Sequence, residues 1–270
     1  MNESSLRPEL KERLIGAIQA TGLDAYVDTI VASAREAIRI VATDDVDVLA
    51  VGESRIGGPP DLADESQWPR YGLGEHKDAF NVFYFQVNLA DVPLVTGVTL
   101  PKQGVLSLFS TSQCQIDDEG AVVFTPDVGA LRTQRLPDIR EFGDEDLDEE
   151  HNVAVCFRKP KKLAFEVCIS LPGDLFMPEN IADDDVDNYL DLLDRIDGGT
   201  LQGQELGWMY SHPLQGMPEE DDASWMTLFN LHSGSPYFSF GDAGNCGVSV
   251  RRQQAAAGDF SEVRLGYCEG

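Results

Sequence analysis

The stretch FNVFYFQVNLADV, residues 80–92, is typical of a β-strand. Polar and apolar side chains alternate within it, so Gln86 and Asn88 share one face of the predicted strand. The stretch FNLH, residues 229–232, has a similar pattern, and each stretch precedes a glycine and a second strand-like run. The similarity predicts two related β units that share one sheet system; chance similarity of two strand–loop–strand pieces is the alternative.

Short apolar runs separated by Gly, Pro and Asp turns extend the strand pattern along most of the chain. We therefore predict a mainly β fold, which is α+β by content. The further runs are VDVLAV (46–51), GVLSLF (104–109), AVVF (121–124), VAVCFR (153–158), KLAFEVCISL (162–171), WMTLFNL (225–231), YFSF (237–240), GVSV (247–250) and EVRLGY (262–267).

Three segments have the apolar spacing of amphipathic helices: residues 4–22, 23–42 and 178–199. The first two predict a pair of N-terminal helices, and the third predicts one further helix that covers the sheet. We expect the chain to divide into an N-terminal helical segment, residues 1–44, packed on a β-rich domain, residues 45–270.

The formal net charge of −27 is the most informative property of the composition. A polyanion is repelled by nucleic acids and by anionic membranes, so neither is expected as a partner. Two interpretations of the charge stay open. The acidic surface either attracts a basic protein or peptide, or it provides solubility in a salt-rich cytoplasm.

The remaining composition favours a cytoplasmic protein with no cofactor or metal. The sequence has no apolar window of about 18 residues and no signal-peptide pattern. Its five cysteines form no C-x-x-C pair, which indicates reduced thiols. The acidic runs 143–150, 183–187 and 219–222 lack the ligand spacing of a calcium loop.

The loop GESRIGGPPDLADESQWP, residues 52–69, concentrates residues with special backbone preferences. Gly57 and Gly58 allow a positive φ or a close approach of another backbone, and the two prolines after them force an extended path. Trp68 is expected to fix the end of the loop by burying its ring. The loop is therefore predicted to shape the fold, and to border any groove beside it.

The polar side chains around this loop have two interpretations each. Arg55 is either a structural clamp to Asp242 or Glu53, or a fork that grips the carboxylate or phosphate of a ligand. Gln86 and Asn88 either make internal hydrogen bonds within the sheet, or form a polar platform for a peptide backbone.

Seven motifs, in this order, resemble the YwqG-like family of bacterial proteins. They are SRIGGPPDL (54–62), QWP (67–69), FYFQVNLADVP (83–93), LPKQGVLSLF (100–109), HPLQGMPEED (212–221), FGDAG (240–244) and DFSEVRLGYCEG (259–270). The resemblance implies a mostly β fold of roll type with N-terminal helices. It implies no established activity, and it suggests an immunity-like or partner-binding role. The chain departs from the family pattern at Asn230, where the family has Gln.

These observations predict a non-enzymatic module that binds a basic protein or peptide, in one version an immunity-like protein that opposes a basic toxin. The alternative is a hydrolase with its site between the SRIGG loop and the GDAG turn, although the sequence has none of the common catalytic motifs. The oligomeric state is left undetermined. The predicted binding residues are Arg55, Gly57, Gly58, Trp68, Gln86, Asn88 and Asp242.

Overall fold

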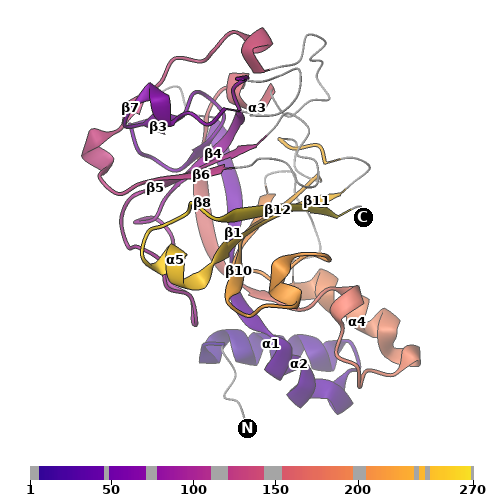
Figure 1. The fold of residues 1–270 in the computed structure, drawn as a ribbon. Coiled ribbons are helices and arrows are strands. Elements are labelled where there is room, and N and C mark those ends of the chain that lie inside the picture. Colours follow the sequence, from indigo (N-terminus) through magenta and orange to yellow (C-terminus); the bar gives the residue numbers. More distant parts are fainter. Residues whose placement is uncertain are drawn as a thin grey trace.

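The computed structural model describes residues 6–45, 49–70, 78–110, 121–142, 154–196, 205–233, 237–240 and 244–268. Within these residues, ten strands form one antiparallel sheet and two short strands form a second (Figure 1), which confirms the predicted mainly β fold. The large sheet contains β1 (Arg35–Asp45), β2 (Arg55–Ile56), β4 (Val82–Asn88), β5 (Val105–Ser110), β6 (Ala121–Thr125), β8 (Lys161–Ser170), β9 (Glu205–Met209), β10 (Trp225–His232), β11 (Asn245–Arg251) and β12 (Val263–Cys268). The small sheet pairs β3 (Asp61–Leu62) with β7 (Arg132–Thr133), and the α-helices are α1 (Pro8–Ala20), α2 (Val27–Ser33), α3 (Ala154–Phe157), α4 (Val186–Ile196) and α5 (Arg252–Ala256).

The strand order of the large sheet is symmetric about its centre. The order is β12-β11-β10-β9-β1-β8-β2-β4-β5-β6. In the chain, β1 to β6 form a first half and β8 to β12 a second half. The long strands β1 and β8 pair with each other, and each also lies beside a strand of the other half: β1 beside β9, and β8 beside β2. Two β units therefore share one sheet and exchange their first strands.

The large sheet curls so that its two halves meet across a common core. Phe85 on β4 and Phe229 on β10 are separated by four strands in the sheet order, yet their ring centroids lie 5.0 Å apart. Near the two edges, Phe124 on β6 lies 5.4 Å from Phe260, which precedes β12. These contacts give the domain the shape of a roll, with the large apolar rings inside.

Three helices gather at one end of the roll (Figure 1). The apolar faces of α1, α2 and α4 form a second buried cluster with the end of β8. Among its members, Leu14 and Ile18 come from α1, Ile30 from α2, Tyr189 from α4 and Ile169 from β8. The first and third predicted helices are confirmed, and they cover this end of the sheet.

The predicted second helix is wrong in its C-terminal part. The helical pattern was extended over residues 23–42, but α2 ends at Ser33, and Ala34 takes the extended φ of −71° and ψ of 147°. The residues that follow form β1, because polar and apolar side chains alternate there and place Ile38 and Ile40 in the roll core. Alternating Ile and Arg satisfied both a helical and a strand period over this short run.

Several short strand predictions also differ from the structure. In the run 153–158, Ala154–Phe157 forms α3 instead of a strand, and residues 237–240 and 49–51 contain no strand. Short apolar runs do not distinguish a strand from a helical turn or a buried loop. The segment 1–44 contains almost all of β1, which pairs with strands from residues 45–270.

Candidate functional site

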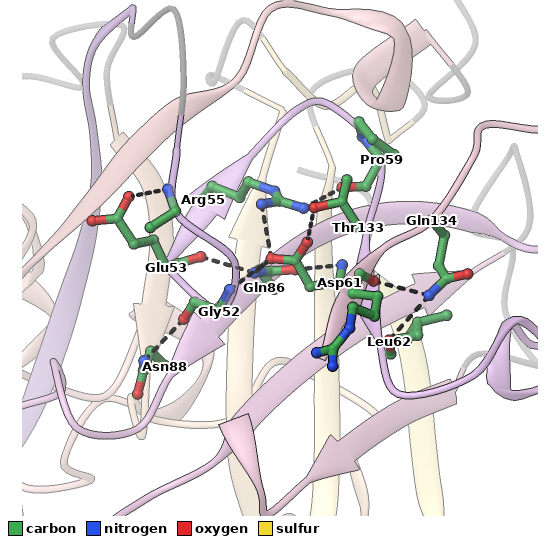
Figure 2. Close-up of polar contacts among 12 residues, drawn as sticks. Gly52, Glu53, Arg55, Pro59, Asp61, Leu62, Gln86, Asn88, Thr133 and Gln134 are labelled. Carbon is green, nitrogen blue, oxygen red and sulfur yellow. Dashed lines mark hydrogen bonds and ion pairs between the residues drawn. The ribbon is translucent and has the colours of Figure 1, made fainter. Parts of the chain in front are cut away.

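The predicted site residues of the first half surround a buried carboxylate that sequence reasoning overlooked. Asp61 lies in β3, directly over the face of β2 and β4 (Figure 2). Its Oδ2 accepts hydrogen bonds from the Gly52 amide at 2.8 Å and from Gln86 Nε2 at 2.9 Å. The same oxygen accepts from Arg55 Nη1 at 2.9 Å, and Oδ1 accepts from Thr133 Oγ1 at 2.7 Å. Asp61 is therefore saturated by donors of its own chain.

Arg55 is a clamp, as one interpretation predicted, and among the described residues its ion-pair partner is Asp61 and not Glu53. Its side chain is buried, pairs with Asp61 and also donates to the Pro59 carbonyl. Burial alone would raise the pKa of Asp61, but the charge of Arg55 and the hydrogen bonds outweigh it and hold this pKa below its usual value. Asp242 lies outside the described residues.

Gln86 and Asn88 hold the main chain of the loop 52–62. Gln86 Oε1 accepts from the Asp61 amide at 3.0 Å, and its Nε2 donates to the Glu53 carbonyl at 2.9 Å. Asn88 Nδ2 donates to the Gly52 carbonyl at 2.9 Å. These two side chains do form a polar platform for a peptide backbone, and the backbone that occupies it is the chain's own (Figure 2).

The remaining predicted residues shape the same half. Gly57 and Gly58 have positive φ angles of 78° and 69°. A Cβ on Gly57 would lie only 3.0 Å from the Lys159 carbonyl oxygen, so the close approach of two backbones requires glycine there. Trp68 is buried, donates from Nε1 to the Asn81 carbonyl at 2.8 Å and packs against three phenylalanine rings.

The second half carries polar side chains at equivalent positions. In the first half Arg55 pairs with Gln86 across β2 and β4, and in the second half Trp208 pairs with Asn230 across β9 and β10. Two residues further along these strands lie Asn88 in the first half and His232 in the second. We call Trp208, Asn230 and His232 the second-half face.

The polar atoms of the second-half face lack the partners that the first half supplies. Asn230 is 8% exposed and His232 is 5% exposed. Among the residues that the structure describes, Asn230 Oδ1 has no hydrogen-bond partner, and neither has Nδ1 or Nε2 of His232. The His232 ring lies 5.4 Å from the ring of Trp208, which is only partly buried. Because each buried unpaired group costs about 1–3 kcal/mol, the fold tolerates a substantial penalty at this face.

Electrostatics makes the second-half face neutral. Burial lowers the pKa of His232 to about 4, so the imidazole is uncharged at neutral pH, with one N–H donor and one acceptor. The nearest cross-strand cation, Arg39, is already paired with Glu205 at 2.5 Å. The first half repeats this arrangement with Lys162 and Glu53 at 3.2 Å.

A hydroxyl–imidazole pair elsewhere in the second half is relevant to the hydrolase alternative. Ser170 Oγ lies 2.9 Å from His212 Nδ1, and His212 Nε2 lies 3.0 Å from the Ser33 carbonyl oxygen. Burial, together with the charge of Arg35, lowers the pKa of His212 to about 3. Such a weak base provides little driving force for proton abstraction at neutral pH, so the pair serves to tie α2, β8 and the end of β9 together.

Metal-ligand clusters and membrane-spanning helices were looked for in the part of the chain that the structure describes. No group of three or more His, Cys, Asp or Glu side chains within it is arranged to hold a metal ion. Nor does this part contain a helix with the length and apolar character needed to cross a membrane. Cys156, Cys168 and Cys246 are buried and not in disulfides.

Sequence reasoning noted Asn230 and His232 but left them out of the predicted site, and it missed Trp208 altogether. The useful signal was the similarity of residues 80–92 and 229–232. It makes Asn230 the equivalent of Gln86, and His232 the equivalent of Asn88. Trp208 was missed because β9 was not predicted.

The described residues form a roll of two β units, each with a polar face. Residues 54–268 match the model of a domain of unknown function (DUF1963), and the chain belongs to this family. No curated protein matches the chain.

Proposed function

We propose that this chain is a YwqG-like, non-enzymatic binding module of the cytoplasm that takes a protein or peptide partner through the second-half face. The observation that carries the proposal is the set of buried polar atoms without partners on Asn230 and His232, beside the partly exposed ring of Trp208. Buried polar groups are normally paired, and unpaired ones point to a functional role.

Partly exposed residues at the rim of the second-half face are accessible to a partner. Asn245, which lies opposite His232 in β11, is partly exposed, as are Trp208 and the side chain of Arg39. A ligand that covers these three residues would lie beside Asn230 and His232. The first half offers no comparable opportunity, since its own loop already uses the equivalent atoms.

The charge of the chain supports a basic partner. A net charge of −27 accelerates encounter with a cationic protein and disfavours acidic competitors. An immunity-like complex, in which the acidic surface opposes a basic toxin, is one concrete form of this proposal.

Affinity capture from the native cell at low and high salt tests the proposal. The wild type is compared with the double variant Asn230→Leu/His232→Leu and with Gln254→Leu, which also removes a buried, unpartnered amide oxygen but lies on α5. We expect a stoichiometric basic partner that binds the wild type and the control, weakens with salt and is lost from the double variant. Equal capture by all three proteins, or a clean monomer at both salt concentrations, would contradict the proposal.

A further inference from the structure

The first half of the sheet shows which chemical group its polar platform binds. Gln86 accepts a hydrogen bond from the main-chain N–H of Asp61 and donates one to the main-chain carbonyl of Glu53. Asn88 likewise takes the Gly52 carbonyl through Nδ2 and the Ala90 amide, at 3.0 Å, through Oδ1. Each side chain therefore binds backbone through both a donor and an acceptor.

The second half reproduces the geometry that positions this platform. Gln86 lies opposite Ser107 of β5, and Asn230 lies opposite Gly247 of β11. Two residues beyond Arg55 the chain takes a positive φ of 78° at Gly57, and two residues beyond Trp208 it takes a positive φ of 63° at Tyr210. A positive φ is uncommon at a residue other than glycine, so its presence after β9 as well as after β2 is a further feature that the two halves share.

The unpartnered atoms restrict the ligand to a neutral group with both a donor and an acceptor. Asn230 Oδ1 can only accept, so the ligand must carry an N–H or O–H. A neutral imidazole needs one acceptor and one donor, so the ligand must also carry an oxygen or nitrogen lone pair. Charged groups nearby are already engaged: Arg39 with Glu205, and Glu219 with the hydroxyls of Thr227 and Ser249. A peptide group is the simplest group that meets these conditions.

The difference between Arg55 in the first half and Trp208 in the second bears on sequence specificity. In the first half, Arg55 pairs with Asp61 of the loop that lies over the face. In the second half, the equivalent position holds the indole of Trp208. A carboxylate placed there would be desolvated without a cation. An apolar side chain would instead pack on the indole ring.

We infer that the second-half face binds extended main chain of the partner, with a peptide group on Asn230 and His232 and an apolar side chain on Trp208. This inference rests on the proposed function and names the chemistry of the contact. It gives the second half the same task that Gln86 and Asn88 perform on the loop 52–62.

Small amides test the chemistry of the site directly. The probes are N-methylacetamide, which has both an N–H and a carbonyl, N,N-dimethylacetamide, which has only the carbonyl, and acetate, which is charged. NMR of the His232 ring and of the Asn230 side-chain amide reports contact, with assignments from His232→Gln and Asn230→Leu. We expect saturable shifts with N-methylacetamide alone. Equal shifts with N,N-dimethylacetamide, or the largest shifts with acetate, would overturn the inference.

Two peptides test the specificity. One is acetyl-GGPPDL-amide, the sequence of residues 57–62, and the other is acetyl-GGPPLL-amide, which replaces the acidic residue by leucine. We expect the leucine peptide to bind the wild type about tenfold more tightly, because its carboxylate-free side chain can pack on Trp208, and this preference should vanish in Trp208→Ala. If neither peptide nor amide shifts the resonances while partner capture still depends on Asn230 and His232, the inference fails and the proposed function stands. If the amides bind as expected but no partner is captured, the proposed function fails on its own.

Discussion

The two halves of the sheet place polar side chains at equivalent positions and complete them in different ways. In the first half, Gln86 and Asn88 are satisfied by the main chain of the chain's own loop. In the second half, Asn230 and His232 are also buried, but they have polar atoms without partners among the described residues. The comparison teaches that a buried amide in a strand is structural when the same chain supplies its partners. Where the chain does not supply them, it marks a site for something else.

The halves share the backbone of the sheet and differ in the side chains of the faces and in what lies over them. Both halves have an ion pair to a central strand: Glu53, which precedes β2, pairs with Lys162 on β8, and Glu205 on β9 pairs with Arg39 on β1. The first half also has Asp61, which its own loop places over the face and pairs with Arg55. The sheet is therefore a common scaffold, and the loop that returns over each half determines its role.

The largest expected effect comes from removing the centre of the first half. Asp61→Ala leaves the buried guanidinium of Arg55 without its carboxylate, and we expect a loss of about 3–5 kcal/mol in the free energy of unfolding. Chemical denaturation measures this loss. Asp127→Ala is the matched control, since this exposed carboxylate only caps a short turn at Gly129, a contact worth about 1 kcal/mol. Equal losses in the two variants would show that Asp61 does not stabilise the first half more than an exposed turn residue does.

The two tryptophans sharpen the comparison next. Trp68→Ala should cost about 3–5 kcal/mol, because its ring is 3% exposed and packs among phenylalanines. Trp208→Ala should cost less than half as much, because its ring is partly exposed and serves the rim of a binding face. Thermal and chemical denaturation of both variants measures the ratio; a greater loss for Trp208 would make it a core residue.

The smallest expected effect is a dependence of stability on pH. Burial lowers the pKa of His232 from 6.5 to about 4 and the pKa of His212 from 6.5 to about 3. Between the unfolded and the folded pKa of each histidine, the unfolded chain therefore binds a proton that the folded chain does not. The free energy of unfolding should therefore fall as the pH drops below 6.5. His232→Leu should reduce this fall by about 1–3 kcal/mol between pH 6.5 and 4.

Carboxylates with lowered pKa values change the free energy of unfolding at a lower pH than the two histidines do. A hydrogen bond from Arg7 is the main reason that the pKa of Glu36 falls to about 2, so its contribution is lost mainly as the pH falls from 4.5 toward 2. Denaturation curves at several pH values separate the two windows. An unchanged pH profile in His232→Leu would contradict the neutral, buried state assigned to this histidine.

The sequence predicted the features that depend on local pattern and missed those that depend on the return of a loop. Alternation in residues 80–92 identified β4 and the shared face of Gln86 and Asn88, and glycine chemistry identified the turn at Gly57. Asp61 was missed because its role arises only when β3 folds back over the sheet. The ambiguous period of residues 23–42 hid β1, which is one of the two central strands of the sheet.

The most direct test of the difference between the halves is the free energy of unfolding of Gln86→Leu and Asn230→Leu, measured side by side by chemical denaturation. Gln86→Leu leaves two main-chain groups of the loop without their hydrogen-bond partner. We predict a loss of about 2–4 kcal/mol in the free energy of unfolding. Asn230→Leu removes an oxygen that has no partner, so its stability should stay within about 1 kcal/mol of the wild type or rise above it. A loss in Asn230→Leu as large as that in Gln86→Leu would mean that both faces are structural, and it would contradict this account.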